Sequence, residues 1–300
     1  MTRLLQLPAA PALSGAMLMV GAGIVFAAVN ILVQLATMTY GIGAPRVAFW
    51  QYLVALVFYL PWLRSKLAES FRTSQLWLHG LRVVFAAAGV QLWVMGLATV
   101  PIWQAIALVM LSPFFVTVGA GLALRETVTP QRWLAVIAGF AGGAVILAPW
   151  SDAFTPAVFY PIGAAALWAF SSLTAKHMTR TETPETLTVY LLLLLTPVNA
   201  AVAAADGFAV PLDAVALVIA AAGALTAAAQ YLLVKAYSVA DAAYLQPFDH
   251  VKLPLNVLLG LAVFGFVPPG SMWLGSLLIV GASFFLLYDE RRAELRGAVP

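Results

Sequence analysis

A cluster of ionisable residues interrupts one of the most apolar stretches of the chain. Asp249, His250 and Lys252 lie just before Pro254, and residues 253–288 carry no charge. An ionisable group at the centre of a membrane helix costs roughly 2.5–3.5 kcal/mol on insertion scales, so each of the three is a functional candidate. Asp249 and Lys252 are three residues apart, so on a helix they share a face and can pair.

Two interpretations of this cluster stay open. Asp249 and Lys252 could form a neutral pair whose only role is to hold the helix in a bundle. Alternatively, Lys252 or His250 contacts a substrate carboxylate, or Asp249 and His250 take up protons in exchange for substrate. Pro254 would leave a backbone carbonyl near His250 without its helical partner, and weakened helices of this kind often line binding sites.

A second pair of ionisable residues, His79 and Arg82, also lies three residues apart in an apolar stretch. We predict that His79 closes the cytoplasmic side of a cavity. Arg82 lies close enough to the expected end of its helix for the long side chain to reach the membrane interface. We therefore predict that Arg82 anchors the helix there.

Uncharged polar and aromatic residues in other apolar stretches supply further candidates. Amides inside a membrane must find partners, so they are expected to face inward, although any one of them could serve only to join two helices. An apolar cavity with a few polar groups is typical of a metabolite site. Trp168 and Tyr244 are the first choices for its walls. The full set of predicted substrate-binding residues is Trp168, Tyr244, Gln246, Lys252, His79, Asn30, Gln91, Trp103 and Gln230.

Composition excludes several classes of function. Hydrophobic residues make up 63% of the 300 positions and charged residues 9%, where a soluble domain has roughly 25% charged. The net charge of +3 comes from scattered basic residues, typical of cytoplasmic loops, so no nucleic-acid partner is predicted. The chain has no cysteine, its histidines are not at metal spacing, and no phosphate-binding loop is present. We predict no metal, no cofactor and no catalytic residue.

The elements that must position these residues are long apolar segments, each of a length that can cross a bilayer. Pro101 separates two of them, because a proline ends one helix and begins the next. We expect an all-α membrane protein with ten transmembrane helices, at about 13–36, 47–63, 77–100, 101–124, 131–149, 158–176, 185–204, 213–235, 241–264 and 272–288.

Loop charges predict the orientation. Most lysines and arginines fall in segments on the side of the N-terminus, whereas Arg46 is the one basic residue of the opposite loops, so both termini are expected to be cytoplasmic. The predicted organisation is a cytoplasmic tail at 1–12, a first five-helix unit at 13–150, a second at 156–288 and a cytoplasmic tail at 289–300.

Internal similarity supports the division into two units. Pro113 and Gly119 are six residues apart, as are Pro254 and Gly260. Because five is an odd number, the second unit would enter the membrane from the opposite side. Such inverted repeats are common in secondary transporters, whose site lies between the halves near the midplane.

The same region carries a family resemblance. The proline within the fourth helix is followed by Leu124-Arg125-Glu126, Thr129, Gln131-Arg132-Trp133 and a glycine-rich helix with Gly139, Gly142 and Gly143. This pattern resembles the EamA-type members of the drug/metabolite transporter superfamily, and among them it looks most similar to the bacterial aromatic amino acid exporters. The resemblance implies ten helices in two inverted repeats and a small-molecule substrate.

We therefore expect a multi-pass protein of a bacterial-type inner membrane that works as a secondary transporter by alternating access. Export of small metabolites is the predicted activity, with amino acids, including aromatic or hydrophobic ones, as the predicted substrates. The alternatives are an efflux carrier for drugs or other metabolites, a channel, or an intramembrane enzyme. The substrate, the coupling ion and the oligomeric state stay open.

Overall fold

The computed structural model describes residues 10–62, 71–123, 129–150, 154–240, 245 and 248–295, and these residues contain helices and no strands. The helices are α1 (Ala10–Gln34), its π-helical continuation η2 (Leu35–Thr39), α2 (Ala44–Trp62), α4 (Leu76–Thr99), α5 (Ile102–Val109), α6 (Ser112–Ala123), α7 (Pro130–Leu147), the short 3-10 helix η3 (Pro156–Val158), α8 (Phe159–Met178), α9 (Pro184–Ala203), α10 (Ala214–Val239), α12 (Lys252–Phe264) and α13 (Gly270–Leu295).

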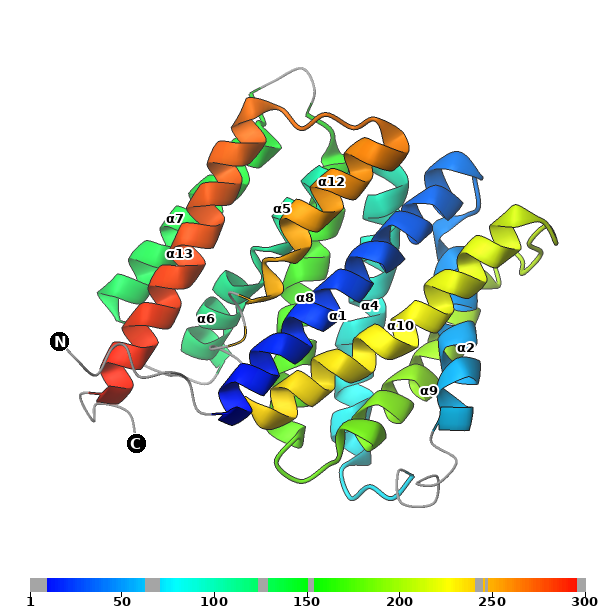
Figure 1. Ribbon diagram of the computed structural model, residues 1–300, viewed down its shortest axis with the longest axis horizontal. Helices are drawn as coiled ribbons and strands as arrows, with labels where there is room; N and C mark the ends of the chain where they lie inside the picture. Colours follow the sequence, from blue (N-terminus) through cyan, green and yellow to red (C-terminus); the bar gives the residue numbers. More distant parts are fainter. Residues whose placement is uncertain are drawn as a thin grey trace.

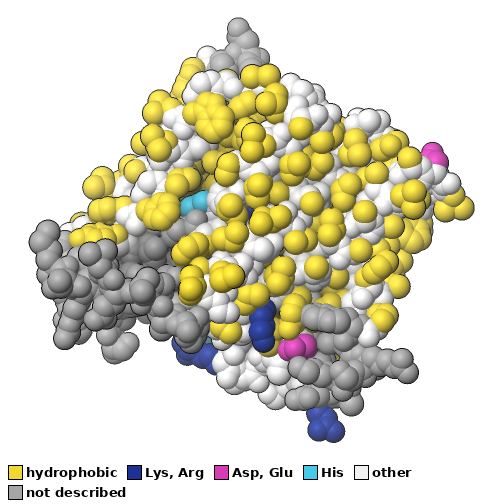
Figure 2. Space-filling model, viewed as in Figure 1, with side chains coloured by type: hydrophobic (Ala, Val, Ile, Leu, Met, Phe, Trp, Pro, Cys, Tyr) yellow, Lys and Arg dark blue, Asp and Glu magenta, His cyan; other side chains and the backbone are white. Residues whose placement is uncertain are grey.

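Seven helical segments of the described chain are long and apolar enough to cross a membrane. Large apolar side chains such as Met17, Ile137, Leu217 and Leu277 are exposed on their outer faces, as a lipid environment allows. Figure 2 shows hydrophobic side chains spread over one whole face of the molecule, with lysines and arginines near its lower edge. Each of the ten ranges expected to be helical contains a described helix. The number of crossings and the side on which the termini lie stay predictions.

The helices pair in a pattern that is preserved when the two halves are exchanged. α1 packs along α10, and its counterpart α8 packs along α4, the counterpart of α10 (Figure 1). In the same way α1 contacts α12, and α8 contacts α6, the counterpart of α12. The corresponding helices of the two halves pair with each other as α2 with α9, α5 with α12 and α7 with α13. Two halves of like fold related by a two-fold axis would produce these contacts.

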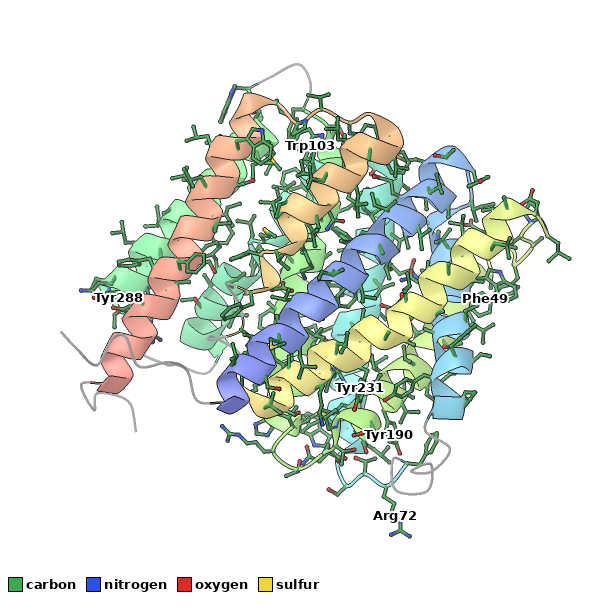
Figure 3. The ribbon with its side chains drawn as sticks, in the orientation of Figure 1. Phe49, Arg72, Trp103, Tyr190, Tyr231 and Tyr288 are labelled. Atoms are coloured by element: carbon green, nitrogen blue, oxygen red, sulfur yellow. The ribbon has the colours of Figure 1, made fainter. Side chains whose placement is uncertain are left out.

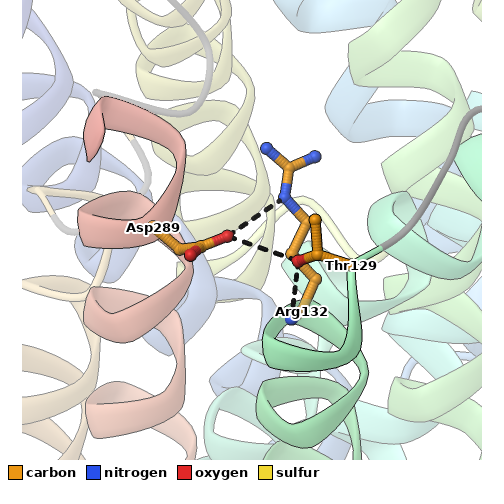
Figure 4. Close-up of polar contacts among 3 residues, drawn as sticks. All are labelled: Thr129, Arg132 and Asp289. Carbon is orange, nitrogen blue, oxygen red and sulfur yellow. Dashed lines mark hydrogen bonds and ion pairs between the residues drawn. The ribbon is translucent and has the colours of Figure 1, made fainter. Parts of the chain in front are cut away.

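The last helices of the two halves pair with each other and pack on α5 and α6 at the edge of the bundle. α7 and α13 run side by side at one end of the molecule (Figure 1). A Cβ added at Gly142 would lie 2.7 Å from the carbonyl oxygen of Gly275, so the two backbones can approach this closely only without side chains. At one end of the pair, Arg132 forms an ion pair with Asp289, with Nε 3.6 Å from Oδ2 (Figure 4). Thr129 donates to the same carboxylate oxygen and caps α7.

The predicted helix 101–124 is interrupted, which is a correction to its expected continuity. Pro101 does separate α4 from α5, but a turn at Met110–Leu111 then divides α5 from α6. A second turn, at His250–Val251, precedes α12. The first turn lies two to three residues before Pro113 and the second three to four residues before Pro254, since a proline cannot donate to the carbonyl one turn earlier and its ring crowds that turn.

Candidate functional site

A cavity of about 170 Å³ lies between the two halves of the bundle. Its walls come from α1, α2, α4, α5, α6, α8, α9, α10 and the segment 249–252, whereas α7 and α13 contribute no residue. Both helix breaks reach it, through Val109 and Met110 on one side and His250 on the other. The interrupted helices therefore place irregular backbone beside the cavity, as in many carriers.

Two tryptophans form an aromatic wall. Trp168 of α8 lies against Trp93 of α4 with ring centroids 5.6 Å apart, and both line the cavity. A Cβ added at Gly89 would lie 2.5 Å from Trp168 Nε1, so the indole occupies space that any other residue at position 89 would fill. The rest of the lining is mainly aliphatic.

The predicted pair between Asp249 and Lys252 forms. Lys252 Nζ lies 2.7 Å from Asp249 Oδ1, and the two side chains are 16% and 28% exposed respectively. The ammonium group also lies 5.7 Å from the centroid of the Phe26 ring, within cation–π range. All three residues line the cavity. The pair thus neutralises two charges that both face the cavity.

His250 lies in the turn between these two partners and is only 8% exposed. Neither ring nitrogen has a hydrogen-bond partner among the described residues. The side chain lines the cavity. Its two nitrogens are therefore free to bind a substrate, water or a proton.

Amides from several helices complete the polar lining. Asn30 Nδ2 donates to Asn256 Oδ1 at 3.2 Å, and Asn256 in turn donates to the Lys252 carbonyl at 2.6 Å. Asn30 and Gln230 both line the cavity. The Gln230 side chain hydrogen-bonds to Tyr52, another lining residue. These contacts join amide groups of α1 and α10 to partners on other helices.

Arg82 is a charged cavity residue that the predicted site did not include. Rather than reaching an interface, it is 4% exposed and lines the cavity, because it lies on the face of α4 that turns toward α9 and the cavity. Its Nη1 donates to the Leu187 carbonyl at 2.8 Å. Spacing could have revealed it, since Arg82, Ala86 and Trp93 share one helical face.

Other predicted residues lie elsewhere. His79 is buried and stacks on Tyr190, with ring centroids 4.3 Å apart. Gln91 donates to Asn199 at 2.9 Å, a contact between α4 and α9. Trp103 packs against the core near one end of the bundle (Figure 3). None of the three is among the lining residues. Tyr244 and Gln246 lie outside the described residues.

Comparison with known proteins places this fold. The sequence profile of the EamA-like transporter family matches residues 13–148 and 155–288. The chain belongs to this family. The expected EamA resemblance is thereby confirmed, and the protein is a membrane transporter rather than an enzyme.

Similar proteins within this family have names that specify substrates. The chain is 52% identical over 287 residues to a riboflavin transporter of Rhizobium johnstonii, covering 96% of this chain and 95% of the relative. It is 47% identical over 286 residues to a riboflavin transporter of Vibrio cholerae, covering 95% and 96%. An S-adenosylmethionine uptake transporter of Rickettsia bellii is 26% identical over 250 residues, covering 83% and 85%.

These relatives do not support the specific similarity expected from sequence. They are named as riboflavin and S-adenosylmethionine transporters rather than aromatic amino acid exporters, so the alternative of a carrier for another metabolite fits better than amino acids. A solved crystal structure aligns with a TM-score of 0.63 and 19% identity, covering 90% of this chain and 97% of the other. At that identity the likeness shows the fold alone.

Proposed function

We propose that this protein carries riboflavin across a bacterial inner membrane as a secondary transporter working by alternating access. The observation that carries the proposal is the similarity to riboflavin transporters, which extends over nearly the whole of both chains. A cavity between two like halves suits alternating access, because rocking one half against the other exposes the same site to each side in turn.

The chemistry of the cavity suits a flavin. Riboflavin has a flat tricyclic ring and a chain of hydroxyl groups. The Trp93–Trp168 wall offers an aromatic face for the ring, and the amides of Asn30 and Gln230 can donate to and accept from hydroxyls. The cavity volume of about 170 Å³ is below the roughly 300–1,000 Å³ of typical ligand pockets, so substrate entry requires the helices to separate.

The charges of the cavity disfavour the second named substrate. S-adenosylmethionine carries a sulfonium and an ammonium group against one carboxylate. Among the described lining residues, Arg82 and Lys252 are cationic and Asp249 is the one acid. An excess of positive charge repels a cation, most strongly where little water screens it. Neutral riboflavin does not meet this penalty.

The cluster at the second helix break is our proposed site of ion coupling. Neither ring nitrogen of His250, beside the Asp249–Lys252 pair, has a partner in the described part of the chain, and Arg82 and Tyr237 line the same cavity. Proton uptake by His250 would add a third cation beside Arg82 and Lys252, which costs electrostatic free energy. A bound substrate would change that free energy and so couple transport to protonation. Under this proposal, His250→Gln abolishes stimulation of transport by a pH gradient while leaving counterflow exchange intact.

Riboflavin counterflow in proteoliposomes tests the proposed function. Vesicles loaded with unlabelled riboflavin should accumulate labelled riboflavin transiently and in a saturable way, which distinguishes a carrier from a channel. Excess S-adenosylmethionine, phenylalanine or tryptophan should not compete. Accumulation of a labelled aromatic amino acid without riboflavin exchange would instead refute riboflavin as the substrate and support an amino acid. Vesicles without protein give the background for both measurements.

A further inference from the structure

Arg82 is a buried cation with few partners among the residues that the structure describes. The guanidinium donates from Nη1 to the Leu187 carbonyl, while Nε has no partner among the described residues. No described acidic side chain pairs with it. Removing a cation from water without a compensating carboxylate is costly in free energy, so a bound acceptor at the guanidinium would be stabilising.

The surrounding residues do not supply that group. Ser171 donates to the backbone carbonyl of Arg82 at 3.4 Å and so leaves the guanidinium unchanged. Asp249, the one described acid in the lining, is held by Lys252 at 2.7 Å. Tyr237 and His79 are further ionisable neighbours; the Tyr237 hydroxyl hydrogen-bonds to Ser172, and the His79 ring stacks on Tyr190. Arg82 therefore lines the cavity with no acidic side chain among the described residues committed to its guanidinium.

We propose that Arg82 binds the dioxopyrimidine edge of a flavin ring whose face packs against the Trp93–Trp168 wall. The assignment rests on the proposed transport of riboflavin. That edge carries the C2 and C4 carbonyl oxygens on either side of the N3–H group, and the C2 carbonyl lies next to the unprotonated ring nitrogen N1. A guanidinium has five donors in a planar fork and no acceptor, so it matches the C2 carbonyl together with N1, which both only accept hydrogen bonds. The ribityl hydroxyls, which both donate and accept, are better served by the amides of Asn30 and Gln230.

Two flavins separate contacts to the ring from contacts to the chain. Lumiflavin has the same dioxopyrimidine edge as riboflavin but a methyl group in place of the ribityl chain. Binding of each to the purified full-length protein is measured from quenching of flavin fluorescence, for wild type, Arg82→Met, Arg82→Lys and Arg82→Gln. Arg132→Met is the matched control, since Arg132 pairs with Asp289 between α7 and α13, away from the cavity.

Loss of Arg82 should weaken both flavins equally. Hydrogen bonds to a charged group correspond to about a 10- to 150-fold change in affinity, so Arg82→Met should raise both Kd values by a factor in that range. Arg82→Lys should fall between wild type and Arg82→Met, because it keeps the charge but not the fork. Arg132→Met should bind both flavins as wild type does.

Melting without ligand tests for a purely structural role. If the hydrogen bond from Arg82 to the Leu187 carbonyl serves only to join α4 to α9, Arg82→Met and Arg82→Gln should melt well below wild type. The folded fraction of each variant should then bind both flavins with wild-type affinity. That result overturns the proposal. A Kd change for riboflavin but not lumiflavin overturns it too, because Arg82 would then contact the ribityl chain. Wild-type protein that binds neither flavin refutes riboflavin transport and the Arg82 assignment together, whereas wild-type binding matched by every Arg82 variant refutes the assignment alone.

Discussion

Removing one partner of the Asp249–Lys252 pair should destabilise the protein, and removing both should restore much of the loss. Breaking a buried pair costs about 3–5 kcal/mol, whereas an exposed pair contributes about 0–1 kcal/mol. With side chains 16% and 28% exposed, these residues lie between the two cases but closer to the buried one. We expect each single replacement to lower the free energy of unfolding by about 1–3 kcal/mol.

The two single variants should not be equal. Lys252→Met removes the ion pair and also the contact of the ammonium group with the Phe26 ring, 5.7 Å from its centroid. Asp249→Asn leaves that contact in place. Cation–π contacts contribute about 0.5–1 kcal/mol at exposed sites, so Lys252→Met should be the less stable variant by about that amount.

Thermal unfolding of the purified variants measures these differences, together with riboflavin counterflow. At roughly 2 °C per kcal/mol for a large chain, the single variants should melt about 2–6 °C below wild type. The double variant Asp249→Asn/Lys252→Met should recover most of that difference. The double variant leaves no charge of the pair without its partner, so it should melt above both single variants. A double variant that melts below both would refute the reasoning. If the stable double variant transports at the wild-type rate, the pair has no role in transport.

Other replacements test separate features of the structure. Trp168→Ala should reduce riboflavin affinity by more than Trp168→Phe, which keeps an aromatic face; equal affinities in a binding assay would remove Trp168 from the site. Gly89→Ala places a Cβ 2.5 Å from the Trp168 ring nitrogen and should cost about 1–3 kcal/mol of stability, together with substrate affinity, as melting and fluorescence quenching would show. Gly142→Ala should cost a similar amount of stability by forcing α7 away from α13, but it should leave riboflavin affinity unchanged. Gly281→Ala is the control, because an added Cβ there would meet nothing within 4 Å, and it should change neither stability nor affinity. A reporter inserted in the turn 267–270 should behave as external, and a cytoplasmic signal there would contradict the inverted-repeat prediction.

Local interactions explain which parts of the site could be predicted from sequence. Asp249 and Lys252 are only three residues apart, so their pairing is a local contact, and it forms across the turn at His250–Val251. The helix break at His250 follows from Pro254 in the same way, because a proline disturbs the carbonyl one turn earlier. The equivalent break before Pro113 was not predicted, although the same argument applies to it.

Distant partners decided the rest. His79 and Arg82 are neighbours on one helix, yet contacts with α9 give them different surroundings. The Tyr190 ring stacks on His79, whereas the Leu187 carbonyl accepts a hydrogen bond from Arg82 Nη1 beside the cavity. Nothing in the local sequence of α4 specifies which residues of α9 it will meet. The hydropathy of the chain alone established a helical membrane protein, because apolar segments of this length have few other stable structures. Which of their polar side chains share a cavity was decided only by the packing of helices from both halves, since each wall of that cavity comes from a different part of the chain.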